Sequence, residues 1–160
     1  MRKSPSATPP QQVNRVVQPE GIVRMDIGLT PSQERALRRL VGILDAAGAC
    51  YQFTGGFAGN LHGSRWPLHD LDVDVTREGL PRLAVFLQPY TTRPLGLYVD
   101  NEFELQLLRA EVEGVAIDVS QAEEAYARVG GRRVSLGTPW HTASASPCWT
   151  WQSGCSRWRS

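Results

Sequence analysis

Closely spaced acidic residues offer the clearest chemistry in this sequence of 160 residues. Asp70, Asp72 and Asp74 alternate with apolar residues over positions 70–75, which is the period-two pattern of a β-strand. On such a strand the three carboxylates share one face, where like charges repel and raise one another's pKa. A nearby arginine could compensate them. A divalent cation would do so better, because hard ions such as Mg²⁺ prefer carboxylate oxygens.

A glycine pair precedes this acidic segment. Gly55 and Gly56 follow the apolar run 50–54, and thirteen residues separate Gly56 from Asp70. A strand that ends in Gly-Gly before a helix lets phosphate oxygens approach unshielded backbone N–H groups at the positive end of the helix. The sequence therefore predicts a phosphate site and a metal site within one strand–helix–strand unit.

A third carboxylate lies in a later apolar segment. Asp118 stands between Ile117 and Val119, and if these apolar neighbours face the core, Asp118 lies on the opposite face of the strand. A neighbouring strand could then bring it beside Asp70 and Asp72. An acid in mid-strand is costly without a partner, and a metal ion or an activated hydroxyl would supply one.

The elements that must position these residues follow from caps and periodicity. Thr30, Pro31 and Gln33 match a helix start with a capping box, apolar residues at 37, 40, 41 and 44 form one helical stripe, and Gly48 ends it. We expect further helices over 57–62, 78–87 and 121–128, and strands over 50–54, 70–75, 95–99, 103–112 and 115–120. The last two strands form a hairpin through Glu113-Gly114.

Composition indicates one domain with extensions. Hydrophobic residues make up 41% of the chain, enough for a core. We expect a flexible N-terminal arm over 1–29, in which only 21–25 could form a strand, and an α/β (α+β) domain over 30–137 with a mixed sheet flanked by helices. The tail over 138–160 carries four of the five tryptophans without helical or strand periodicity, so we expect it to be irregular.

Charge and cysteine usage exclude several classes of protein. The chain has 17 basic and 16 acidic residues, which argues against a protein held to nucleic acid mainly by bulk charge. Its three scattered cysteines fit neither a disulfide scaffold nor a zinc site. It shows no apolar run of membrane-spanning length and no signal-peptide pattern. We therefore expect a soluble cytoplasmic protein.

The order of these motifs resembles the nucleotidyltransferase superfamily, the fold shared by polymerase-β-like enzymes and aminoglycoside nucleotidyltransferases. The family pattern is Gly-Gly or Gly-Ser after a hydrophobic residue, a spacer of about this length, Asp-hydrophobic-Asp, and a later acid on a strand. The matching residues are Gly55, Gly56, Asp70, Asp72 and Asp118, and the segment 55–75 looks closest to small bacterial members of uncertain substrate. Residues 72 and 74 form a second Asp-hydrophobic-Asp pair, so two registers stay open, although the spacer favours the first.

The resemblance implies a metal-dependent enzyme. Asp70 and Asp72 would hold two Mg²⁺ ions against the triphosphate of an NTP, and Asp118 would bind the metal nearer the acceptor and assist its hydroxyl. Transfer of the nucleoside monophosphate would release pyrophosphate. Ser64 and Arg65 could neutralise phosphate charge, or form an ordinary turn.

Little of the chain follows residue 120 to bind an acceptor, whose identity the sequence leaves open. Family members usually add a second domain or dimerise for that purpose. The acceptor could therefore bind at the interface of a homo-oligomer. The alternative is a catalytically inactive nucleotide-binding or regulatory protein on the same fold, antitoxin-like or a truncated copy.

Overall fold

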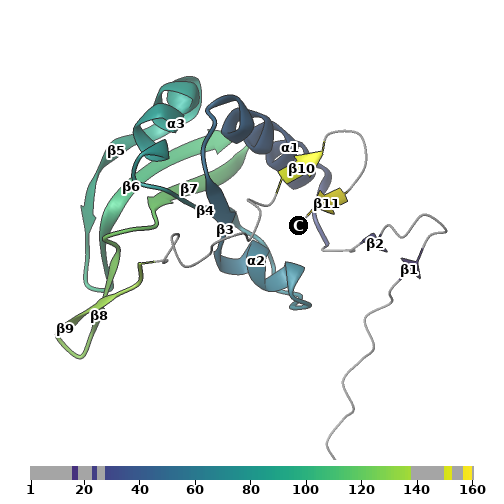
Figure 1. The fold of residues 1–160 in the computed structure, drawn as a ribbon. Helices are drawn as coiled ribbons and strands as arrows, with labels where there is room; N and C mark the ends of the chain where they lie inside the picture. The colour runs from purple at the N-terminus through teal and green to yellow at the C-terminus, as the bar shows by residue number, and fades with distance from the viewer. Residues whose placement is uncertain (1–15, 18–22, 25–27, 138–149, 153–156, 160) are drawn as a thin grey trace, which may run out of the picture.

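The computed structural model describes residues 16–17, 23–24, 28–137, 150–152 and 157–159. Within 28–137 a mixed sheet carries helices α1 and α3 on one face (Figure 1). The elements of this part are α1 Pro31–Ala46, β3 Tyr51–Phe53, α2 Gly55–Leu61, β4 Asp70–Val75, α3 Gly79–Leu87, the 3₁₀ turn Gln88–Tyr90, β5 Thr91–Val99, β6 Phe103–Val112, β7 Val115–Gln121, β8 Tyr126–Val129 and β9 Arg132–Ser135.

The sheet has the strand order β3-β4-β7-β6-β8-β9, and β5 also pairs with β6. The β4–β7 pair is parallel, whereas the other pairs in this sheet are antiparallel. Two further two-stranded pairs join β1 (Val16–Val17) to β2 (Val23–Arg24) and β10 (Thr150–Gln152) to β11 (Arg157–Arg159). Most of the predicted arm and tail, including most of the expected strand 21–25, lies outside the described residues.

The capping box predicted for the first helix is confirmed. The Thr30 hydroxyl accepts a hydrogen bond from the Gln33 backbone N–H, and the Gln33 side chain accepts one from the Thr30 N–H. Two of the free N–H groups of the first turn are thereby satisfied. The helix buries Leu37, Leu40 and Leu44, and Gly48 follows its end with a φ of +58°, as a terminating glycine does.

The core lies between the helices and one face of β4, β6 and β7. Leu71, Val73 and Val75 on β4, and Ile117 and Val119 on β7, have no exposed surface. Each such side chain contributes about 1.5–3 kcal/mol when it is removed from water. Because strand side chains alternate, this packing turns the intervening polar residues to the opposite face of the sheet.

The helix predicted over 121–128 is wrong. Residues 126–129 form β8, which pairs with β6 and with β9. Gly130 and Gly131 both have positive φ angles (+56° and +76°) and join Val129 to Arg132, the geometry of a two-residue hairpin turn. Hairpin formation by this glycine pair outweighs the weak helical pattern of the preceding residues.

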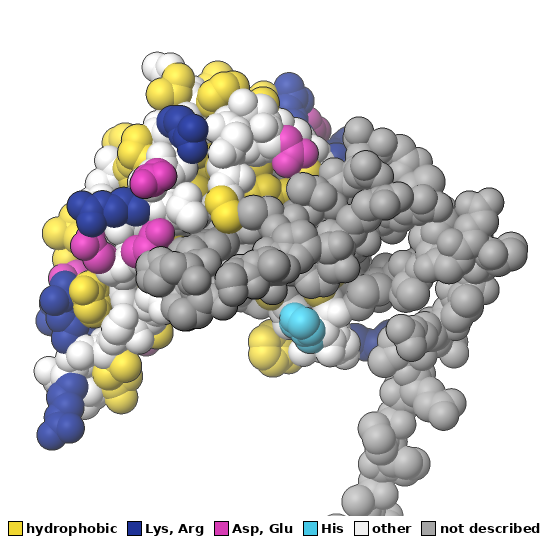
Figure 2. Space-filling view, in the orientation of Figure 1, with side chains coloured by type: hydrophobic (Ala, Val, Ile, Leu, Met, Phe, Trp, Pro, Cys, Tyr) yellow, Lys and Arg dark blue, Asp and Glu magenta, His cyan; other side chains and the backbone are white. Residues whose placement is uncertain are grey.

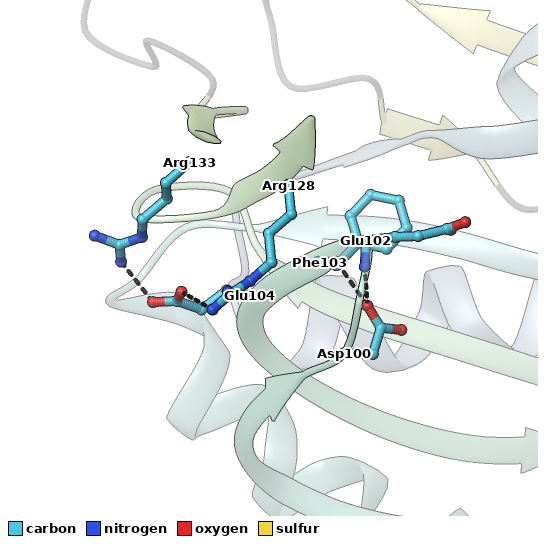
Figure 3. Close-up of polar contacts among 6 residues, drawn as sticks. All are labelled: Asp100, Glu102, Phe103, Glu104, Arg128 and Arg133. Carbon is cyan, nitrogen blue, oxygen red and sulfur yellow. Dashed lines mark hydrogen bonds and ion pairs between the residues drawn. The ribbon is translucent and has the colours of Figure 1, made fainter. Parts of the chain in front are cut away.

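Ion pairs fix the β8–β9 hairpin to β6 (Figure 3). The Glu104 carboxylate accepts from Arg128 Nη2 at 3.1 Å and from Arg133 Nη2 at 2.6 Å. At the turn between β5 and β6, Asp100 Oδ1 accepts from the backbone N–H groups of Glu102 and Phe103 at 2.7 and 2.6 Å. Together these contacts attach β8 and β9 to β6 and fix the turn between β5 and β6.

Among the described helices, none has the length and apolar character needed to cross a membrane.

Candidate functional site

The parallel pairing of β4 with β7 brings two of the predicted acids together. Asp72 lies opposite Asp118, while Asp70 lies opposite Ala116 and Asp74 opposite Ser120. Both strands bury their apolar residues on the helix-covered face, so Asp72 and Asp118 share the open face. The expectation that a neighbouring strand places Asp118 beside the first acidic segment is thus met by the backbone register.

The acids on β4 differ in their hydrogen-bond partners. Asp74 accepts from the Ser120 hydroxyl at 2.6 Å and from Gln52 Nε2 at 3.2 Å. Over the residues that the structure describes, no hydrogen bond or ion pair reaches the Asp72 carboxylate. Asp74 is therefore held by donors within the protein, whereas Asp72 is not.

The surroundings of Asp72 also disfavour its ionisation. Burial, and then the charges of Asp70, Asp118 and Asp74, raise its pKa to about 6. An acid that is half-buried, surrounded by like charge and without a donor is costly to keep ionised. A bound cation would relieve that cost.

Gly55 is a glycine because Asp72 lies against it. Its φ is +58°, and a Cβ built on it would lie 1.9 Å from Asp72 Oδ2. The backbone N–H of Thr54 donates to the Asp72 carbonyl at 2.9 Å, which fixes the approach. Gly56 is constrained by packing instead, since its Cβ would lie 3.2 Å from Leu68 Cδ2.

The connection between α2 and β4 is held by a buried side chain. Asn60 is 4% exposed; its Nδ2 donates to the Trp66 carbonyl and its Oδ1 accepts from the Trp66 N–H, both at 2.9 Å. Ser64 and Arg65 lie in this loop. Neither lines the pocket described next, and the same is true of Gly56 and Asp70.

A pocket of about 500 Å³ opens beside the Asp72–Asp118 pair. The residues that line it are polar (Thr54, Gly55, Asp72, Asp74, Tyr98, Asp100, Arg109, Asp118 and Ser120) and apolar (Phe103, Leu105, Leu107, Ala122, Ala125 and Leu136). In Figure 2, acidic and basic side chains alternate with apolar ones along the left of the view, where β5, β6 and the β8–β9 hairpin lie in Figure 1. The lining of the pocket thus combines carboxylates, one guanidinium and apolar side chains.

Sequence reasoning missed Arg109 and Tyr98. Arg109 Nε donates to Asp118 Oδ2 at 3.1 Å, and the guanidinium lies over the Tyr98 ring at 5.6 Å from its centroid. The signal for Arg109 was present, because the turn predicted at Glu113-Gly114 fixes the β6–β7 register and places Arg109 opposite Asp118. Tyr98 lies opposite Leu105 of β6, whereas the place of Arg93, which also contacts the Tyr98 ring, depends on register irregularities between residues 91 and 96 that the sequence did not indicate.

The acids present fit a divalent cation by their chemistry, but they do not form one compact cluster. Within the described part of the chain, no three His, Cys, Asp or Glu side chains are grouped closely enough to hold a metal ion. Asp118 is paired with Arg109, and Asp70 is exposed at the start of β4. The unpartnered Asp72 oxygens, with acids on both sides, are nevertheless the hard ligands that Mg²⁺ prefers.

Comparison with known proteins supports the fold. A crystal structure of a "putative nucleotidyltransferase" from Thermotoga maritima matches with a TM-score of 0.60 over 71% of this chain and 70% of that one, at 15% sequence identity. No protein-family model matches the chain, and the search of curated proteins found no significant match. The predicted α+β fold with a mixed sheet and flanking helices is confirmed as nucleotidyltransferase-like; at this identity the likeness concerns the fold alone.

Proposed function

We propose that this protein is a metal-dependent nucleotidyltransferase, which transfers a nucleoside monophosphate from an NTP to an acceptor hydroxyl and releases pyrophosphate. The observation that carries the proposal is the cross-strand pair of Asp72 and Asp118 on the wall of the pocket, with Gly55 against Asp72. The raised pKa of Asp72 supports it, as does the nucleotidyltransferase-like fold.

In this proposal Asp70 and Asp72 would hold Mg²⁺, and Asp118 would contribute a further carboxylate ligand. The cation would supply neutralisation of phosphate charge and a lowered pKa of the attacking hydroxyl. The glycine pair leaves room for phosphate oxygens beside the backbone. Asp118 would also assist the acceptor hydroxyl, by lowering its pKa or by taking its proton. Ser64 and Arg65 remain candidates for binding phosphate. Because they do not line the pocket, their loop would have to move toward it.

One observation favours a second candidate function. Asp118 already has a cationic partner in Arg109, and a carboxylate neutralised by an arginine is a poorer metal ligand. A chain that keeps this ion pair permanently would be a nucleotide-binding or regulatory protein without transfer activity.

Calorimetric titration distinguishes these functions through two comparisons: with and without Mg²⁺, and wild type against a variant of the acids. Non-hydrolysable ATP and GTP analogues are titrated with and without Mg²⁺ into the wild type and the double variant Asp70→Asn/Asp72→Asn. Binding that requires Mg²⁺ and is lost in the variant supports the site. Binding without Mg²⁺ supports the second candidate, and no binding to folded protein overturns the transferase and leaves a regulatory protein that does not bind nucleotide.

A further inference from the structure

Arg109 is the only basic residue among the described side chains that line the pocket. It projects from β6 at the position opposite Asp118 of β7. Its Nε lies 3.1 Å from Asp118 Oδ2, and the two side chains keep 43% and 25% of their surface exposed. An ion pair with this exposure is weak, so Arg109 can be displaced from Asp118 by a stronger competitor.

The guanidinium of Arg109 has a second support that does not depend on Asp118. It lies over the ring of Tyr98, which Arg93 contacts as well, with centroid distances of 5.6 and 4.8 Å. The Tyr98 hydroxyl donates to Asp100 Oδ2 at 2.6 Å, which fixes the ring. Arg109 therefore stays at the pocket when its contact with Asp118 is lost.

The charges of the pocket put Arg109 in competition with a cation. Four carboxylates, Asp72, Asp74, Asp100 and Asp118, and one guanidinium line it. Asp74 and Asp100 are engaged by Ser120, Gln52, Tyr98 and backbone N–H groups. A divalent cation bound at Asp72 would take its further oxygen ligands from Asp118, where Arg109 now donates.

We propose that Arg109 exchanges partners: it neutralises Asp118 in the cation-free protein and binds phosphate oxygens of the nucleotide once a divalent cation has occupied Asp72 and Asp118. This inference rests on the proposed nucleotide site. The planar guanidinium suits phosphate, to which it donates two parallel hydrogen bonds. Because the cation releases the group that binds the anion, binding of each strengthens binding of the other.

The test measures two affinities that one substitution moves in opposite directions. Mg²⁺ alone, and then a non-hydrolysable ATP analogue at saturating Mg²⁺, are titrated into wild type and Arg109→Gln. We expect Arg109→Gln to bind Mg²⁺ roughly three- to tenfold more tightly, because a competing positive charge has been removed. We expect it to bind the nucleotide analogue roughly 10- to 100-fold more weakly, because a charge-assisted hydrogen bond is lost.

Two further variants separate this mechanism from general effects. Arg93→Gln removes the other guanidinium on Tyr98 without touching Asp118, so both affinities stay within about twofold of wild type. Arg109→Lys keeps the charge and the aliphatic stem, so Mg²⁺ affinity stays near that of wild type while the loss of the planar fork weakens nucleotide binding. Thermal melting of each variant checks that it is folded.

Three outcomes would overturn the inference or part of it. Mg²⁺ affinity that is blocked by Asp72→Asn but unchanged or weakened by Arg109→Gln overturns the inference and leaves the proposed site intact. If both Arg109 variants bind the nucleotide analogue as tightly as the wild type, phosphate is not a partner of Arg109 and the inference is overturned. Absence of Mg²⁺ binding to the wild type overturns the proposed function together with the inference.

Discussion

Replacing Asp72 by asparagine is expected to stabilise the cation-free protein at neutral pH. The Asp72 pKa rises from 3.8 to about 6 on folding, first through burial and then through the charges of Asp70, Asp118 and Asp74. A shift of this size corresponds to about 3 kcal/mol against ionisation. Partial exposure of Asp72 reduces the effect on stability to about 1–2 kcal/mol.

The sign of the pH dependence follows from proton linkage. A carboxyl whose pKa is higher in the folded state binds its proton more tightly there, so ionisation favours unfolding. Well below pH 3.8, Asp72 is protonated in both states and no penalty applies. The penalty grows as the pH rises from about 4 to 6 and is complete above that range. Asp72→Asn therefore exceeds the free energy of unfolding of the wild type by only about 0.2–0.4 kcal/mol at pH 4, and by about 1–2 kcal/mol at pH 7.5.

Urea denaturation in EDTA at both pH values measures this difference. Asp74→Asn is the matched control, because its carboxylate lies two residues along the same strand and accepts hydrogen bonds from Ser120 and Gln52. That variant should lose stability at pH 7.5 instead of gaining it. The reasoning is refuted if Asp72→Asn is no more stable than wild type at pH 7.5, or if its gain is equally large at pH 4.

Further substitutions test the supports of the site. Gly55→Ala should destabilise the fold by roughly 1–3 kcal/mol, because residue 55 has a positive φ and the added Cβ would overlap the Asp72 carboxylate. Equal urea midpoints for the variant and the wild type would contradict the close approach of Gly55 to Asp72. Asn60→Ala should lower the free energy of unfolding by about 2–3 kcal/mol, because the backbone N–H and carbonyl of Trp66 lose their hydrogen bonds to Asn60. Limited proteolysis should then cut the α2–β4 loop faster. Glu104→Gln should change global stability by less than about 1 kcal/mol but accelerate amide hydrogen exchange in the β8–β9 hairpin, whose two arginine contacts it weakens; unchanged exchange there would show that backbone pairing alone fixes the hairpin.

Local patterns in the sequence were sufficient for the central strands. The alternation over 70–75 predicted β4 and its acidic face, and the residues around Asp118 predicted β7 and its open-face acid. Both predictions rest on the same physical rule, that apolar side chains every second residue seek the core. This rule also explains why the acids share the face opposite the helices.

Features that depend on tertiary register were harder to predict. The 121–128 segment has local helical character, yet it forms part of a hairpin because Gly130-Gly131 turns the chain. The pairing of Arg109 with Asp118 needed the predicted turn at 113–114 to be extended along both strands. The contact of Arg93 with Tyr98 needed the irregular register of β5 on either side of Arg93.

The parallel β4–β7 pair has a consequence for the order in which the chain folds. Asp74 and Ser120, neighbours across this pair, are separated by 46 positions, whereas Arg109 and Asp118 in the β6–β7 hairpin are separated by nine. Short loops close with a smaller entropy loss than long ones, and contacts between distant positions slow folding. The β6–β7 hairpin should therefore form first and β4 join it late, so that the repulsion between Asp72 and Asp118 arises near the end of folding. Raising the pH above the Asp72 pKa would then speed unfolding more than it slows folding.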